Sequence, residues 1–321
     1  MIYYFSGAAH QEIKREMNVD QLFSAYHEKK LVENVIKYKK ENPDKDFHIM
    51  LDSGAFSHYM NSLKKGIKLT DEDMYAYTDE YLKFLDKVGD DLTCFVAVDS
   101  VPNPAAMDYT LAEKTWKNYL YMYDRIRPEN RDKLIPVFHF GEDFKWLKQY
   151  LEYRHADGSP IDYIGLAISL EGTRSVRIKW ALECEKIIRE SSNPNVKTHA
   201  FGVGVKSVLE HIHVTSTDAT SWVKRAAFGM IAIDDKSVVI SSVQRDNPNS
   251  DKYYGNSSMA YTSAVEDVIK ERGYTLEDLQ EKTNERVRFN IDDTLRWVKE
   301  LNDTQEKRDA VQKLSMKKSL W

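Results

Sequence analysis

Short apolar runs recur along the chain, each followed by turn residues and, in most cases, by a stretch with helical spacing. Runs of four to eight residues bounded by turn signals are typical of buried strands. Eight runs predict strands: residues 2–5, 47–51, 93–98, 134–140, 162–169, 198–203, 212–217 and 228–233. Apolar residues that return every three or four positions predict amphipathic helices over residues 20–41, 104–126, 142–154 and 174–190.

Strands that alternate with helices in this way indicate parallel βα units. Eight such units favour a closed (β/α)8 TIM barrel, and an open doubly wound sheet is the alternative. The chain has 321 residues, a length that suits one barrel with some additional structure. We therefore expect an α/β fold with a TIM-barrel catalytic domain over residues 1–235.

The pattern changes after residue 235. Residues 236–256 predict a small insertion or hairpin that ends in a polar, turn-rich loop. Residues 257–273 have the spacing of a helix, with serines suited to its N-cap and Gly273 suited to its C-terminal end. Thr275 starts a second capping signal, Thr-x-x-Asp, so residues 257–321 are expected to form C-terminal helices that complete and flank the barrel.

Composition limits the class of protein. No apolar run reaches the roughly 18 residues of a membrane span, and the N-terminus lacks the features of a signal peptide. Two cysteines cannot form a disulfide framework and favour a reducing compartment, so we expect a cytoplasmic protein that does not enter a membrane.

A net charge of −5 gives no overall attraction to nucleic acid, so a nucleic-acid enzyme would need a local basic face. Three clusters could supply one: Lys64, Lys65 and Lys68; Lys224 and Arg225; and Lys313, Lys317 and Lys318. The alternative is that these are ordinary solvated side chains.

Titratable residues stand at the ends of four predicted strands, where TIM barrels carry their active sites. These residues are Asp52, Asp99, His139 and Asp218. One aspartate alone is compatible with a helix cap or a turn, but three converging carboxylates are costly unless they bind, catalyse or share protons. Such a set could hold a divalent metal, or could act on a glycosidic bond with one acid as nucleophile and another as proton shuttle.

Metal binding by histidines has less support. His211 and His213 share one strand face, but no third ligand is evident and both are expected near the start of a strand.

Six short motifs, in order and each near a predicted strand end, resemble the tRNA-guanine transglycosylase superfamily. They are DSGAFS (52–57), AVDSVPNP (97–104), PVFHFG (136–141), IGLAISLE (164–171), HAFGVG (199–204) and STDATSW (216–222). The resemblance covers about residues 47–225 and implies an enzyme that exchanges guanine in a polynucleotide for a 7-deazaguanine base.

The resemblance implies a role for each matching residue. Asp218 would attack C1′ of the sugar and expel guanine as a covalent glycosyl-enzyme forms, and Asp52 would act as general acid and base. The implied base-binding residues are Phe56, Asp99, His139, Gly165, Leu166 and Phe201. Phe56 would stack on the base, and the backbone of Gly165 and Leu166 would face its polar edge. Lys224 and Arg225 would contact phosphates, and Trp222, with Tyr253 or Tyr254, could stack on flanking bases.

The chain departs from the family pattern at His139, which stands where the family has glutamine, at Ala55 in place of its second glycine and at Ser57 in place of the glutamine after the phenylalanine. No cysteine follows Cys184 to form the family's zinc site, so residues 236–256 would replace the zinc subdomain and no metal or other cofactor is expected. The zinc-free pattern is closest in character to phage and bacterial enzymes that place 7-deazaguanines such as preQ0 into DNA. DNA is therefore the favoured substrate, with tRNA as the alternative.

Other functions remain open. The chain could be a catalytically silent barrel that binds nucleic acid or a protein, or a metal-dependent barrel lyase or hydrolase. A homodimer or a complex with a partner protein is possible.

Overall fold

The computed structural model describes residues 1–100, 111–168, 173–246 and 252–318, with side chains described up to residue 305. The main sheet contains β1 (Ile2–Ser6), β2 (Gln21–Ser24), β3 (Ile49–Asp52), β4 (Cys94–Val96), β5 (Leu134–Ile135), β6 (Val137–His139), β7 (Tyr163–Ala167), β8 (Lys197–Ala200) and β9 (Ser216–Ala219). The helices among them are α1 (Gln11–Glu16), α2 (Lys29–Glu41), α3 (Ala55–Lys64), α4 (Asp71–Val88), α5 (Leu111–Arg125), α6 (Lys145–Glu152), α7 (Arg174–Arg189), α8 (Lys206–Leu209) and α9 (Ser221–Ala227).

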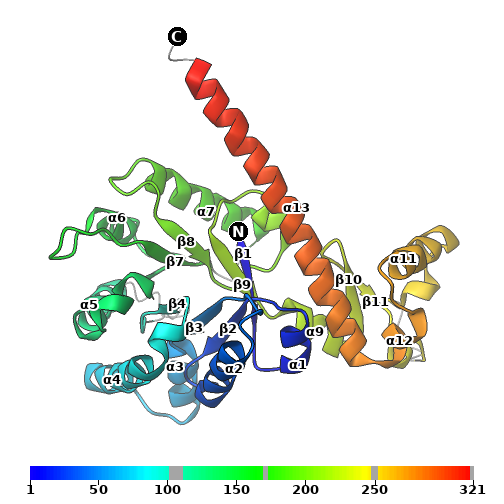
Figure 1. Ribbon diagram of the computed structural model, residues 1–321, viewed down its shortest axis with the longest axis horizontal. Coiled ribbons are helices and arrows are strands. Elements are labelled where there is room, and N and C mark those ends of the chain that lie inside the picture. Colours follow the sequence, from blue (N-terminus) through cyan, green and yellow to red (C-terminus); the bar gives the residue numbers. More distant parts are fainter. Residues whose placement is uncertain (101–110, 169–172, 247–251, 319–321) are drawn as a thin grey trace.

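The nine strands form a nearly closed parallel barrel with flanking helices (Figure 1). The sheet runs in the order β5-β4-β3-β2-β1-β9-β8-β7-β6, so β5 and β6 lie at its two edges. These edges are parts of one continuous run that is interrupted at Pro136, which has no N–H to donate. The Ala97 N–H donates to the Ile135 carbonyl at 2.9 Å, and the Gly165 N–H donates to the Pro136 carbonyl at 2.8 Å. The chain itself therefore joins the two edges, and the predicted TIM-like α/β barrel is confirmed.

Two strand predictions were wrong. Residues 228–233 do not supply a barrel strand, because β10 (Met230–Ile233) pairs antiparallel with β11 (Lys236–Val239). Asp234 and Asp235, with φ of 52° and 62°, form the tight two-residue turn typical of such hairpins. The boundary expected at residues 235 and 236 falls inside this turn. The eighth strand position is instead held by β2, which lies within the predicted helix 20–41 because Leu22, Phe23 and Tyr26 also fit helical spacing.

Asp218, the candidate nucleophile, lies within a strand and not directly after one as predicted. Residues 212–217 were expected as a strand that precedes Asp218, whereas β9 runs from Ser216 to Ala219 and contains it. Side-chain alternation then places Ser216 and Asp218 on one face of β9. The bounds of this strand were misplaced because β9 contains only one apolar residue.

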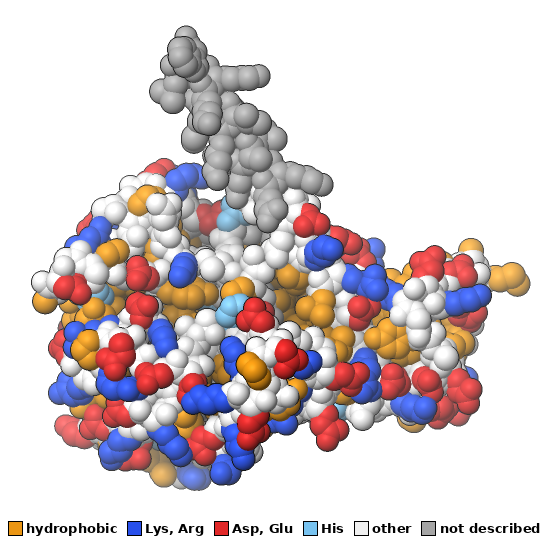
Figure 2. Space-filling view, viewed as in Figure 1, with side chains coloured by type: hydrophobic (Ala, Val, Ile, Leu, Met, Phe, Trp, Pro, Cys, Tyr) orange, Lys and Arg blue, Asp and Glu red, His pale blue; other side chains and the backbone are white. Residues whose placement is uncertain are grey.

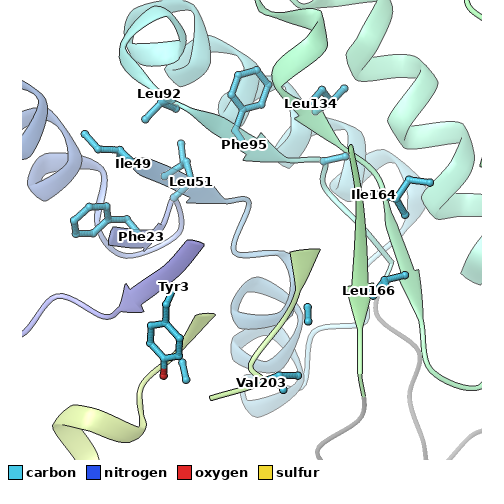
Figure 3. Packing of buried hydrophobic residues seen from close by; sticks show 14 of the residues in the cluster. Tyr3, Phe23, Ile49, Leu51, Leu92, Phe95, Leu134, Ile164, Leu166 and Val203 are labelled. Atoms are coloured by element: carbon cyan, nitrogen blue, oxygen red, sulfur yellow. The ribbon is translucent and has the colours of Figure 1, made fainter. Parts of the chain in front are cut away.

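The barrel packs outward onto its helices through the larger core cluster. Outward-facing residues of successive strands, among them Tyr3, Phe23, Leu51 and Phe95, are almost fully buried in this layer (Figure 3). A smaller cluster contains Tyr4, Leu22, Met50, Cys94, Ile135 and Tyr163. The strand register places the members of this smaller cluster on the opposite face of the sheet, inside the barrel.

The C-terminal part has its own core. It comprises β10, β11, α10 (Ser242–Arg245), α11 (Met259–Glu271), α12 (Leu276–Glu281) and the beginning of α13 (Thr283–Lys318). Ser258 caps α11 and Thr275 caps α12, as the sequence predicted. Figure 1 shows this unit beside the barrel, with α13 passing along α9 and β10. Among the described residues, no helix is long and apolar enough to cross a membrane.

Candidate active site

Polar side chains fill the barrel interior toward the C-terminal ends of the strands. Tyr4 and Ser6 lie on the same face of β1, and Met50 and Asp52 on the same face of β3, because side chains alternate along a strand. Each of these strands therefore changes inside the barrel from a bulky residue to a polar one as it approaches its C-terminal end. This is the end at which TIM barrels build active sites.

Asp218 is held as a carboxylate by three donors. The Ser6 hydroxyl donates to Oδ2 at 2.6 Å, and the Gly202 N–H donates to Oδ1 at 2.8 Å. His199 Nε2 lies 3.2 Å from Oδ1. Burial opposes ionisation, but the hydrogen bonds and the charge of His199 outweigh it and lower the pKa of Asp218. Oδ1 thus has two partners and Oδ2 has one, which leaves Oδ2 as the freer oxygen.

His199 begins a buried hydrogen-bonded chain that the sequence analysis missed. Its Nδ1 lies 2.5 Å from the Ser216 hydroxyl, which lies 2.6 Å from the Tyr163 hydroxyl. With a proton on Nε2, His199 would donate to Asp218 Oδ1, while its Nδ1 meets the Ser216 hydroxyl. The signal was the polar alternation of Ser216 and Asp218 beside a histidine in the neighbouring strand.

Asp52 has the opposite electrostatic environment. Its Oδ2 accepts the Gly54 N–H at 3.0 Å. Burial, followed by the negative charges of Asp99 and Asp218, raises the pKa of Asp52 to about 7. Gly54 has φ of 77°, and a Cβ there would meet Tyr26 Cβ at 2.5 Å, so only glycine suits this turn. The turn therefore presents Asp52 as a carboxyl group that can gain or lose a proton near neutrality.

Asp99 is held by His139, whose ring lies between the carboxylates of Asp99 and Glu142. His139 Nε2 lies 2.7 Å from Asp99 Oδ2, and His139 Nδ1 lies 3.1 Å from Glu142 Oε1. Burial alone would lower the pKa of His139, but the hydrogen bonds with these two acids raise it to about 9. Both ring nitrogens are occupied, so His139 orients Asp99 and is not free to donate to a base as the sequence suggested. Glu142, three residues after His139, was missed.

A cavity of about 300 Å³ adjoins Asp99. Ala55 and Tyr59 of α3 and Asn118 of α5 contribute to its wall. This volume is at the lower end of the range for ligand-binding cavities. Asp99 therefore borders a cavity that also adjoins α3 and α5.

The other base-binding candidates differ in how accessible they are to a ligand. Phe56 is 58% exposed at the start of α3, so its ring is free to stack. A Cβ on Gly165 would meet the Phe201 ring at 2.4 Å, so this glycine makes room for Phe201. The Gly165 N–H and the Leu166 carbonyl are both used between strands, the first with Pro136 and the second with the Phe201 N–H. These two backbone groups are therefore engaged within the sheet.

The proposed nucleic-acid contacts after Asp218 are mostly wrong. Trp222 is fully buried against Phe5, and its ring cannot reach a base. The Arg225 guanidinium pairs with Asp235 at 2.8 Å within the protein. Lys224 is exposed and remains available. Tyr253 and Tyr254 are buried in the C-terminal core and do not stack on flanking bases.

Neither a metal-binding group among the described residues nor similarity to a known protein adds support for a function. Within the described part of the chain, no group of three or more His, Cys, Asp or Glu side chains is arranged to hold a metal ion. No model of a known protein family matches the chain, and no curated protein matches it either. The resemblance to the transglycosylases therefore rests on the six short motifs alone.

Proposed function

We propose that the protein is a base-exchanging transglycosylase that replaces guanine in a polynucleotide, with DNA favoured, by a 7-deazaguanine. The observation that carries this proposal is the pair of acids with opposite pKa shifts at the barrel mouth. The pKa of Asp218 is lowered and that of Asp52 is raised to about 7. One ionised and one protonated carboxyl group is the combination that covalent glycosyl transfer requires.

In the first half of the reaction, Asp218 Oδ2 attacks C1′ of the nucleotide. The bond between C1′ and the base nitrogen breaks, and its electron pair leaves with guanine. Asp52 donates its proton to the departing base and becomes a carboxylate. The sugar is then an ester of Asp218, whose carbonyl oxygen is Oδ1, which faces the Gly202 N–H and His199.

In the second half, a nitrogen of the incoming 7-deazaguanine attacks C1′. The bond between C1′ and Oδ2 breaks, and its electron pair restores the Asp218 carboxylate. The proton of the attacking nitrogen passes to Asp52, so both acids return to their starting states. The donors on Oδ1 favour this departure, because they stabilise the carboxylate that reforms.

The base would bind between Phe56 and Asp99. Phe56 offers an exposed aromatic face, and Asp99, oriented by His139, offers a carboxylate to the N–H groups of a guanine-like edge. The identity of the base and the preference for DNA rest on the sequence resemblance. The tRNA enzyme is the alternative within the same chemistry.

A labelled-base assay tests the function directly. Purified protein is incubated with isotope-labelled preQ0 and either DNA or tRNA, and the nucleic acid is digested to nucleosides for mass spectrometry. We expect label in DNA nucleosides. Label only in tRNA would identify tRNA as the substrate in place of DNA. Label in neither nucleic acid, with cell extract supplied as a source of partner proteins, would overturn the proposed function. Saturable binding of the base without exchange would then favour a silent barrel.

Two substitutions of His199 test its role as a positioning residue for Asp218. Glutamine keeps a donor near the position of Nε2, whereas asparagine keeps one near Nδ1 and cannot reach Asp218. We expect His199→Gln to retain exchange within about tenfold. We expect His199→Asn to lose about 10²-fold and to shift upward the acidic limb of the pH–rate profile for guanine release, the half-reaction that needs an ionised Asp218, because Asp218 loses a donor that lowers its pKa. Equal losses with unchanged pH profiles would assign His199 a purely structural role.

A further inference from the structure

Helix α3 has apolar side chains on its solvent-exposed face, which is unusual for an outer helix of a barrel. At about 100° per residue, Phe56, Met60 and Leu63 fall within an arc of about 60°. They are 58%, 36% and 47% exposed, and Ile67, just beyond the helix, is 51% exposed. An outer helix of a barrel ordinarily buries such a stripe against the strands.

The inward face of α3 is held instead by polar and aromatic groups. The His58 ring stacks on Tyr77 at 4.3 Å, and the Asn61 amide donates to the Tyr26 hydroxyl at 2.6 Å. The Tyr77 hydroxyl in turn donates to the Ser53 carbonyl at 2.5 Å. The exposure of the apolar face is therefore fixed by specific contacts on the opposite side of the helix.

This exposed stripe is concentrated and begins at the candidate active site. Phe56 follows Asp52 by four residues, across the Gly54 turn. Four of the thirteen exposed large apolar side chains in the described part of the chain lie between residues 56 and 67. Isolated apolar residues on a surface need no explanation, but a contiguous patch marks a binding surface.

Three exposed lysines border the stripe, and none of them pairs with an acid among the described side chains. Lys64, Lys65 and Lys68 are exposed, and no acidic residue occurs from residue 53 to residue 70. Among the side chains that the structure describes, no carboxylate lies within 4.0 Å of their ammonium groups. The nearest acids in sequence have other partners, since Asp71 pairs with Lys114 and Asp73 caps α4 through Thr70.

We propose that this surface, formed by Phe56, Met60, Leu63, Lys64, Lys65, Ile67 and Lys68, binds the polynucleotide strand beside the extruded nucleotide. The occupant is argued from charge and position. Unpaired lysines suit phosphodiesters, and Phe, Met, Leu and Ile side chains suit unstacked bases or an opened base step. From Phe56 to Lys64 the helix rises about 12 Å, which spans three or four nucleotides of a strand at about 3.4 Å each. This inference rests on the proposed function and identifies the surface that binds the substrate strand next to the active site.

The test measures binding, so it does not require exchange. Fluorescence anisotropy follows the binding of labelled single-stranded DNA, duplex DNA and RNA over a range of salt concentrations. Combined Lys64→Gln, Lys65→Gln and Lys68→Gln substitutions should weaken binding at least about tenfold. They should also reduce the slope of log affinity against log salt by about 2 for a single strand, at about 0.7 per phosphate contact.

A matched control carries the same change of charge elsewhere. Lys37→Gln, Lys83→Gln and Lys148→Gln, on α2, α4 and α6, should leave affinity within about twofold and the salt slope unchanged. Met60→Ser with Leu63→Ser should weaken single-strand binding with little change in the slope. Thermal melts confirm that every variant is folded.

The outcomes separate the surface from the function. Binding that depends on Lys64, Lys65 and Lys68, without base exchange by the wild-type protein, would support the surface and overturn the proposed function. Equal effects of the two triple variants would overturn the surface even if exchange occurs, and no polynucleotide binding at all would overturn both the surface and the function. A dimer that Met60→Ser and Leu63→Ser convert to a monomer while polynucleotide affinity is unchanged would also overturn the surface.

Discussion

Asp218→Asn is expected to reduce base exchange by at least about 10³-fold, because an amide cannot form the glycosyl ester on which exchange depends. Exchange is measured as labelled 7-deazaguanine incorporated per enzyme molecule. The variant should also lose about 1–3 kcal/mol of unfolding free energy, because an amide nitrogen would face one of the donors from Ser6, Gly202 and His199.

Asp162→Asn supplies the control, since Asp162 is exposed and directly precedes β7, at the opposite end of the barrel. This variant should exchange the base at the wild-type rate. Full activity of Asp218→Asn would remove Asp218 as the nucleophile, and a loss confined to an unfolded variant would be recognised by its circular dichroism.

Asp52→Asn is expected to abolish exchange and yet to stabilise the protein above neutral pH. The pKa of Asp52 is about 7 in the folded protein and near 4 in an unfolded chain. The folded state therefore binds the proton more tightly, so this group favours folding at low pH and loses that contribution as pH rises from about 4 to about 7. Asparagine carries no charge at any pH and escapes the cost of a buried carboxylate.

The stability gain of Asp52→Asn should therefore grow from near zero at pH 4 to an upper limit of about 4 kcal/mol above pH 7. Urea unfolding at several pH values measures it. A gain that is independent of pH would mean that the Asp52 carboxyl has an ordinary pKa, and a gain that falls as pH rises would mean that its pKa is lowered; either result would contradict the raised pKa. The wild-type exchange rate should be bell-shaped around pH 7, because Asp52 gives up a proton in one half of the reaction and takes one in the other.

Periodicity along the chain predicted the barrel, because most of its strands are apolar runs and its helices are amphipathic. It placed the strand at β9 a few residues too early, because only Ala219 of β9 is apolar. It missed β2, which is four residues long within a stretch that also fits a helix. The hairpin of β10 and β11 looked like another barrel strand, although two successive aspartates between apolar runs are compatible with a tight turn.

The acids of the candidate site were predictable because each stands at or near the end of a strand. Their different protonation was not, since it depends on neighbours from other strands. Asp218 is held ionised by Ser6 of β1 and His199 of β8, whereas Asp52 has only its own turn as donor. Trp222 was misjudged for a similar reason, because exposure follows from packing against Phe5 and not from proximity to Asp218 in sequence.

The most direct test of the mechanism is to trap the covalent intermediate. Protein is mixed with a guanine-containing polynucleotide, quenched in acid and digested with nuclease and protease, and the peptides are analysed by mass spectrometry. A nucleotide-sized mass on Asp218, absent from Asp218→Asn and lost when free 7-deazaguanine is added before the quench, is the predicted result. Sustained exchange with an unmodified Asp218, or an adduct on Asp52 instead, would contradict it.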